Sequence, residues 1–182
     1  MAAIYSLANF TIIVTDGDSD SGIAGISHGK RQAPIRDQIS GFVFTTQPAS
    51  WQEIAESASI WSTRGWTYQE AVLSPRQLYL TEAQAIFQCS TFITTEDGMT
   101  KEIESFPEAY KLPSSRLSSW EPVCINFYRH ISRYRKRSLT NLSDVYNAIA
   151  GVATALYGAP NPLWKGLPRQ EFDESLLWAL WQ

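Results

Sequence analysis

One carboxylate in the sequence has the neighbours that chemistry would need. Glu70 closes the stretch RGWTYQE, residues 64–70, and follows Trp66 by four residues. That spacing places the two side chains one turn apart on a helix. Because the flanking residues are largely apolar, Glu70 must be paired or hydrogen-bonded unless a cleft opens beside it. Two roles stay open: a catalytic carboxylate, or a structural one bound to a backbone amide or an arginine.

Metal chemistry lacks its usual ligands in this chain. The two cysteines, Cys89 and Cys124, and the two histidines, His28 and His130, show no metal-ligand spacing. The sequence also has no Gly-rich phosphate loop, His-Glu metal motif or Ser-His-Asp constellation. We therefore predict no metal site, no bound cofactor, and two reduced, buried thiols.

An aspartate-rich loop resembles part of a calcium motif. Asp16, Asp18 and Asp20 alternate like the first ligands of an EF-hand. Ser21 and Ser27, however, stand where that loop needs a glycine and a bidentate glutamate, and a strand precedes the loop instead of a helix. The pattern favours a plain solvated loop.

Charge and hydropathy restrict the partners. The 182 residues include 15 basic and 18 acidic ones, which gives a formal net charge of -3. The chain as a whole therefore lacks the excess of positive charge that favours nucleic-acid binding. No window approaches the ~18 apolar residues of a membrane span, and no signal sequence is present, so we predict a cytoplasmic protein.

One basic run is interleaved with tyrosines, and we interpret it as a solvated helix face, with nucleic-acid binding unlikely. Its cations are Arg129, Arg133, Arg135, Lys136 and Arg137.

Alternating helix and strand patterns fill residues 1–90. They predict an α/β half in which the helix that carries Glu70 packs on the strands and ends at Pro75. The predicted elements are a helical end at residues 1–8, strands at Phe10 to Thr15 and Phe42 to Thr46, a helix from Ser57 to Ser74, and a β-hairpin over residues 77–89.

The remainder of the chain is predicted to be a linker and a helical region. Residues 91–119 contain prolines and a serine-rich run, typical of a linker with one short helix at 102–109. Residues 120–182 show two apolar stripes at helical spacing and stop within a third, which predicts a region truncated at its C-terminal end. The positions predicted to be buried are Val123, Phe127, Ile131, Leu142, Val145, Ile149 and Val152.

The wording around Glu70 resembles a known family. The run WSTRGWTYQEAVLSPRQLYL, residues 61–80, is similar to the heterokaryon incompatibility (HET) domain of fungi. MAAIYSLANFTIIV upstream and RSLTNLSDVYNAIAG downstream resemble the same family. Two family blocks, of Ser-Tyr-x-Trp-Gly and Trp-Ile-Asp…Cys-Ile-Asn-Gln type, are missing. The resemblance thus implies an N-terminally truncated member.

This resemblance implies a fold and a reaction. HET domains are thought to be related to TIR domains, so residues 1–90 would be the second half of a TIR-like, flavodoxin-like α/β domain, followed by the mainly helical region. Some TIR domains cleave NAD with one glutamate, on a helix with a Trp-Cys-x-x-Glu pattern. Trp66 and Glu70 keep that spacing, with Thr67 in place of the cysteine. In an intact member, Glu70 would be the catalytic residue, Trp66 would line the nucleotide site, and NAD would be a substrate. The truncated chain alone is expected to be weakly active or inactive.

Two functions of different classes follow from the resemblance. The first is an effector of non-self recognition and programmed cell death, acting through NAD cleavage or through assembly. The second is a non-catalytic interaction or regulatory fragment of a HET protein. Both imply protein partners or self-association.

Overall fold

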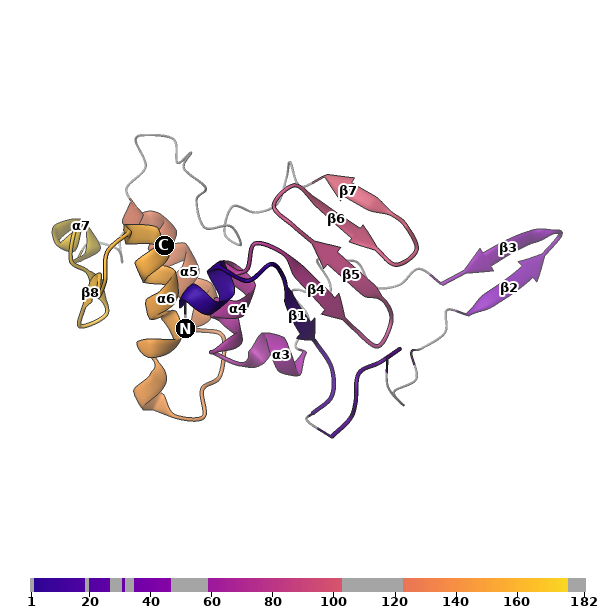
Figure 1. Ribbon diagram of the computed structural model, residues 1–182, viewed down its shortest axis with the longest axis horizontal. Helices are drawn as coiled ribbons and strands as arrows, with labels where there is room; N and C mark the ends of the chain where they lie inside the picture. The colour runs from indigo at the N-terminus through magenta and orange to yellow at the C-terminus, as the bar shows by residue number, and fades with distance from the viewer. Residues whose placement is uncertain are drawn as a thin grey trace. The chain divides into compact units, whose positions relative to one another are not determined.

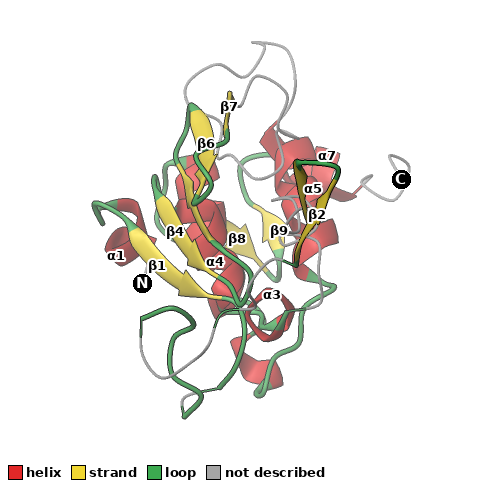
Figure 2. Ribbon diagram, turned by 90° about the vertical axis from the view of Figure 1, so that its right-hand side faces the viewer, coloured by secondary structure: helices red, strands yellow, loops and turns green. Residues whose placement is uncertain are grey.

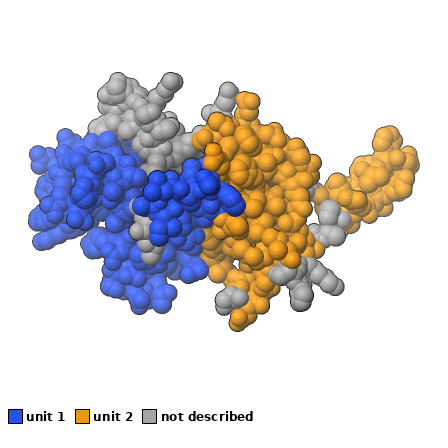
Figure 3. Space-filling view, viewed as in Figure 1, with its two compact units in different colours: residues 1–11, 63–75, 104–182 blue, residues 12–62, 76–103 orange. Residues whose placement is uncertain are grey.

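The computed structural model describes residues 2–18, 20–26, 31, 35–46, 59–102 and 123–176 (Figure 1). They belong to two compact units that interleave in sequence, coloured separately in Figure 3. Unit 1 comprises residues 1–11, 63–75 and 104–182, and unit 2 comprises residues 12–62 and 76–103. The predicted domains followed one another along the chain, whereas the observed chain passes repeatedly between its two units.

Unit 2 is built on a five-stranded sheet, whose strands are yellow in Figure 2 and follow the order β1-β4-β5-β6-β7. From β4 to β7 each strand pairs antiparallel with the next, while β1 and β4 run in the same direction in Figure 1. The mixed sheet and its helices confirm the predicted α/β class. The strands are β1 (Thr11–Val14), β4 (Gln77–Leu80), β5 (Ala85–Gln88), β6 (Phe92–Thr95) and β7 (Thr100–Glu102).

The core of this sheet comes from alternate strand positions. Tyr79 and Ile86 lie opposite each other in the β4–β5 register and are both buried. Trp61 packs edge-on against the Tyr79 ring, with centroids 5.8 Å apart. The turn between β4 and β5 is closed by Thr81, whose Oγ1 accepts the backbone N–H groups of residues 83 and 84. The predicted hairpin over residues 77–89 is therefore confirmed.

A second hairpin forms a sheet of its own. β2 (Arg36–Ile39) pairs antiparallel with β3 (Phe42–Thr45) and with no strand of the larger sheet. The second predicted strand is thus confirmed as a strand, but it does not join the sheet that contains β1. Every described side chain of this hairpin is exposed.

Unit 1 is mainly helical, as predicted for the C-terminal part of the chain. Helices from distant parts of the sequence pack together in this unit, since α4 contacts both α1 and α6. The elements are α1 (Ala2–Ser6), α4 (Thr67–Leu73), α5 (Val123–Tyr134), the short 3-10 helix η2 (Leu142–Asp144), α6 (Asn147–Tyr157), β8 (Leu163–Trp164), β9 (Leu167–Pro168) and α7 (Phe172–Leu176).

The core of unit 1 forms where α4, α5 and α6 meet. Phe127 of α5 and Val152 of α6 are completely buried, as predicted, and Tyr68 of α4 packs in the same cluster. α6 ends at Gly158, which takes a left-handed conformation with φ 63°. That geometry closes many helices and favours glycine.

Two predicted boundaries are corrected by the structure. The predicted helix from Ser57 to Ser74 is broken: α3 (Ile60–Thr63) and α4 are separated at residues 64–66. Within its own unit, α4 packs on helices α1 and α6. Residues 57–58 lie outside the described residues, as do residues 103–109 of the short helix predicted at 102–109. The first residue of that predicted helix, Glu102, is in β7.

Two further differences concern the second half of the chain. Residues 92–102, predicted as part of a linker, form β6 and β7, because Phe92 to Thr95 can extend the antiparallel ladder from β5. Leu142, predicted to be buried, is 82% exposed. A 3-10 turn replaces the expected first turn of helix there, and α6 begins only at Asn147.

Among the described residues, none of the helices has both the length and the apolar character that a membrane span requires.

Candidate functional site

The break before α4 is made by a backbone bridge. The N–H of Gly65 donates to the carbonyl of Ser138 (2.7 Å), and the N–H of Ser138 donates to the carbonyl of Thr63 (2.6 Å). These bonds divert the chain from a continuous helix, since backbone groups paired with another segment cannot join a helical ladder. Gly65 is required by space, because a Cβ there would lie 2.5 Å from Leu139 Cδ2.

We expect Gly65→Ala to destabilise the protein by about 1–3 kcal/mol, the usual cost of forcing an extra methyl into a packed site. Thermal unfolding measures the loss. Leu139→Ala removes the atoms that the new methyl would meet, so Gly65→Ala should cost less in that background. Equal costs in both backgrounds would contradict the steric explanation.

Arg137 holds the first turn of α4 in place. Its Nη1 donates to Thr67 Oγ1 (2.8 Å) and to the carbonyl of Arg64 (3.3 Å). Its guanidinium also lies over the Tyr68 ring, 5.0 Å from the centroid, a cation–π distance. At least this member of the predicted basic run therefore has a structural role in unit 1.

Glu70 is half-buried on α4 and is bound by a tyrosine. The hydroxyl of Tyr5, on α1, donates to Glu70 Oε1 at 3.2 Å. Burial raises the pKa of Tyr5, and the charge of Glu70 and the hydrogen bond to it raise this pKa further, because all three disfavour a phenolate. The sequence suggested a backbone amide or an arginine as the structural partner, and the structure shows a phenol among the partners of Glu70.

Trp66 and Gln69 precede Glu70 at the start of α4 and contact other parts of unit 1. Trp66 stands at the N-cap of α4 with helical backbone angles and packs, half-buried, against the core of unit 1. Gln69 is buried, and its Nε2 donates to the carbonyl of Asn147 at the start of α6 (3.0 Å). The structure thus places Trp66 and Glu70 on the same short helix, on the sequence spacing that suggested them.

A buried polar pair lies deeper in the same unit. The Tyr68 hydroxyl and His130 Nδ1 are 2.8 Å apart, and both residues are 1% exposed. Burial, aided by the positive charge of Arg133, lowers the pKa of His130 to about 4. His130 is therefore neutral near pH 7. No local sequence pattern indicates this pair, because its members are 62 positions apart in the chain.

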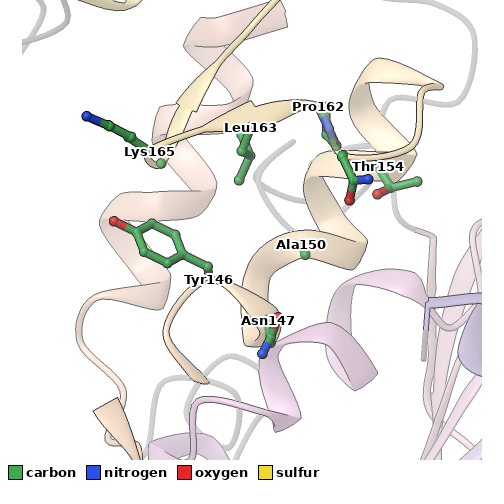
Figure 4. A pocket seen from close by; sticks show the side chains of 9 residues that line it. Tyr146, Asn147, Ala150, Thr154, Pro162, Leu163 and Lys165 are labelled. Carbon is green, nitrogen blue, oxygen red and sulfur yellow. The ribbon is translucent and has the colours of Figure 1, made fainter. Parts of the chain in front are cut away.

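Two hollows open in unit 1, and they share Tyr146, Leu163 and Gly166. The first, of about 310 Å³, lies between α6 and the β8–β9 hairpin, and Leu163 points into it (Figure 4). The second, of about 330 Å³, is mostly apolar. Neither is lined by Glu70, by Trp66 or by any carboxylate or imidazole. These hollows therefore offer no general base among the described residues, and Glu70 stays the candidate carboxylate.

The described residues contain no cluster of three His, Cys, Asp or Glu side chains that could hold a metal ion. Both cysteines are free: Cys124 is buried, as predicted, whereas Cys89 is only half-buried. Asp16 accepts a hydrogen bond from Thr15 instead of facing the other aspartates of its loop as a ligand set. The chemistry open to the site is thus that of a carboxylate next to aromatic groups.

The amino-terminal part of the chain matches a known family. Residues 1–70 match the sequence model of the heterokaryon incompatibility protein (HET) family. These residues therefore carry a HET domain match. The match confirms the family that the sequence motifs indicated. No curated protein and no solved structure matches the chain.

The HET match can be placed on the fold. It includes α1, β1, the β2–β3 hairpin, α3 and the first turn of α4, and Glu70 is its last residue. Tyr5 and Glu70, which the hydrogen bond joins, both lie within it. Tyr5 was missed from the sequence, since nothing in a tyrosine near the amino terminus indicates a partner 65 positions away.

Proposed function

We propose that this protein acts in heterokaryon incompatibility, as an effector of non-self recognition and programmed cell death. The single observation that carries the proposal is the match of residues 1–70 to the HET family. The protein would act in the cytoplasm, with NAD as a substrate instead of a bound cofactor.

We further propose that Glu70 is the catalytic carboxylate of a TIR-like NAD cleavage. Its support is the Trp66–Glu70 spacing on α4 and the half-buried position of the carboxylate. As the bond between ribose and nicotinamide breaks, nicotinamide leaves as a neutral base, and the ribose carbon becomes positively charged. Glu70 would stabilise that charge until water adds and releases a proton, and Trp66 would wall the site. The products are nicotinamide and ADP-ribose.

A second function is favoured by a specific contact. Tyr5 already donates to Glu70, which ties α1 to α4 across unit 1. A carboxylate used in this way is a structural residue, and the protein would then act as a non-catalytic interaction module of the HET family. Removing the Glu70 charge would stop NAD cleavage under the first function and would change only stability under the second.

The experiment compares Glu70→Gln with Tyr5→Phe in the 182-residue chain. Glu70→Gln removes the charge and keeps the size, whereas Tyr5→Phe removes only the hydrogen bond. We expect wild type and Tyr5→Phe to consume NAD weakly and to kill a fungal host on expression, and Glu70→Gln to do neither while remaining folded.

Two results would overturn the catalytic proposal. One is a folded wild-type chain that leaves NAD intact. The other is a Glu70→Gln variant that retains NAD loss. If both substitutions instead lower the unfolding temperature similarly and leave cell death intact, Glu70 is structural and the interaction function holds.

A further inference from the structure

The β2–β3 hairpin has one apolar face. Residues that lie opposite in an antiparallel register share a face, so Ile39 with Phe42 and Asp37 with Phe44 lie on the same side. Ile35, two residues before Asp37, belongs to this side as well. The exposed fractions are 73% for Ile35, 56% for Ile39, 72% for Phe42 and 55% for Phe44. The other side carries Arg36, Gln38, Val43 and Thr45.

Such a hairpin is not expected to be stable by itself. Isolated two-stranded hairpins are marginal in water, and three or more strands with an apolar face are usually needed. The turn is well formed, since Ser40 and Gly41 have φ of 53° and 84°, as a type I′ turn requires. What the hairpin lacks is therefore additional strands, and not a proper turn.

The hydrogen-bond pattern shows which groups face outward. Thr46 N–H donates to the carbonyl of Ile35 (3.0 Å), so the pair 35–46 is hydrogen-bonded. Because bonded and non-bonded pairs alternate along an antiparallel ladder, the pairs 37–44 and 39–42 are bonded too. The backbone groups of Gln38 on β2, and of Val43 and Thr45 on β3, must then point away from the partner strand.

The two outer edges of the hairpin differ in charge and in whether their outward backbone N–H groups have an acceptor within the hairpin. On β2, the outward N–H of Gln38 donates to Asp37 Oδ1 (2.8 Å), and Arg36 adds a second charge. β3, with the sequence FVFT, carries no charge. By the same alternation, the amides of Val43 and Thr45 have no acceptor on β2, the strand that pairs with β3. Charged residues block strand addition at an edge, and uncharged β-formers permit it.

We propose that β3 pairs antiparallel with β3 of a second copy of this chain, forming a four-stranded sheet across a two-fold axis. Symmetric pairing around Val43 or Phe44 keeps the apolar faces of both hairpins on one side and places phenylalanines of the two copies next to each other. A second copy fits this edge because FVFT is self-complementary and uncharged. The same pairing through β2 would set Arg36 and Asp37 of two copies into one ladder.

The test is sedimentation velocity on the full chain over about a hundred-fold range of concentration, where a dimer should dissociate on dilution. Val43→Pro removes an outward N–H from β3, and Gln38→Pro is the matched change on β2. We expect wild type and Gln38→Pro to form dimers, and Val43→Pro to raise the dimer dissociation constant about tenfold or more. Circular dichroism confirms that all three are folded.

A second pair of variants tests the same edge without proline, which could disturb the fold of the hairpin itself. Val43→Lys places like charges across the two-fold axis, so its dimer should be weak at low salt and recover as salt screens the repulsion. Gln38→Lys should not change the dimer. The proposal is overturned if wild type is monomeric throughout, as it would be were the face covered by its own chain. It is also overturned if the β2 and β3 variants weaken the dimer equally.

Discussion

Phe127→Ala is expected to remove about 3–5 kcal/mol of stability, a large part of the 5–15 kcal/mol that holds a typical domain folded. Phe127 is 0% exposed, and its ring packs edge-on against Tyr128 and Tyr157, with centroids 5.6 and 6.1 Å away. Truncation loses the transfer free energy of the ring and leaves a cavity, because neighbours fixed in a packed core collapse only partly.

Urea unfolding measures this effect as a lower midpoint with an unchanged slope. Leu142→Ala is the matched control, since Leu142 is 82% exposed on the same unit and should cost no more than about 0.5 kcal/mol. The sequence pattern predicted that both residues are buried. Equal losses for the two variants would therefore favour the sequence prediction and contradict the structure.

The apolar periodicity of the sequence predicted most elements correctly but not their partners. α5, α6 and the β4–β5 hairpin were predicted because their side-chain spacing is local information. The packing of α4 on α1 and α6 was not predicted, because the periodicity of a helix shows that it is buried but not against what. The bridge between Gly65 and Ser138, which breaks the predicted helix, joins segments that no local pattern connects.

The candidate site shows the same division between local and long-range information. Trp66 and Glu70 were found because their spacing of four is visible in the sequence. Tyr5, which donates to Glu70, and Arg137, which supports the first turn of α4, become neighbours only through folding. The Tyr68–His130 pair belongs to this second group, and it leads to a pH-dependent property of the protein.

His130 should make the protein less stable as the pH falls from about 6.5 to about 4. In the unfolded chain a histidine titrates near 6.5, whereas burial, aided by the charge of Arg133, lowers the pKa of His130 to about 4 in the folded protein. Between these values the unfolded chain binds more protons, so the free energy of unfolding rises with pH. The stabilisation is complete above pH 6.5 and is lost, by about 3 kcal/mol, on acidification to pH 4.

The measurement is the free energy of unfolding of wild type and His130→Gln between pH 4 and pH 8. Glutamine cannot take up a proton in this range, and its carbonyl oxygen can still accept from the Tyr68 hydroxyl. Other groups titrate alike in both proteins and cancel in the difference. Wild type should therefore exceed His130→Gln most above pH 6.5 and lose about 3 kcal/mol of that advantage by pH 4. Two parallel profiles would show that His130 takes up its proton as readily in the folded protein as in the unfolded one.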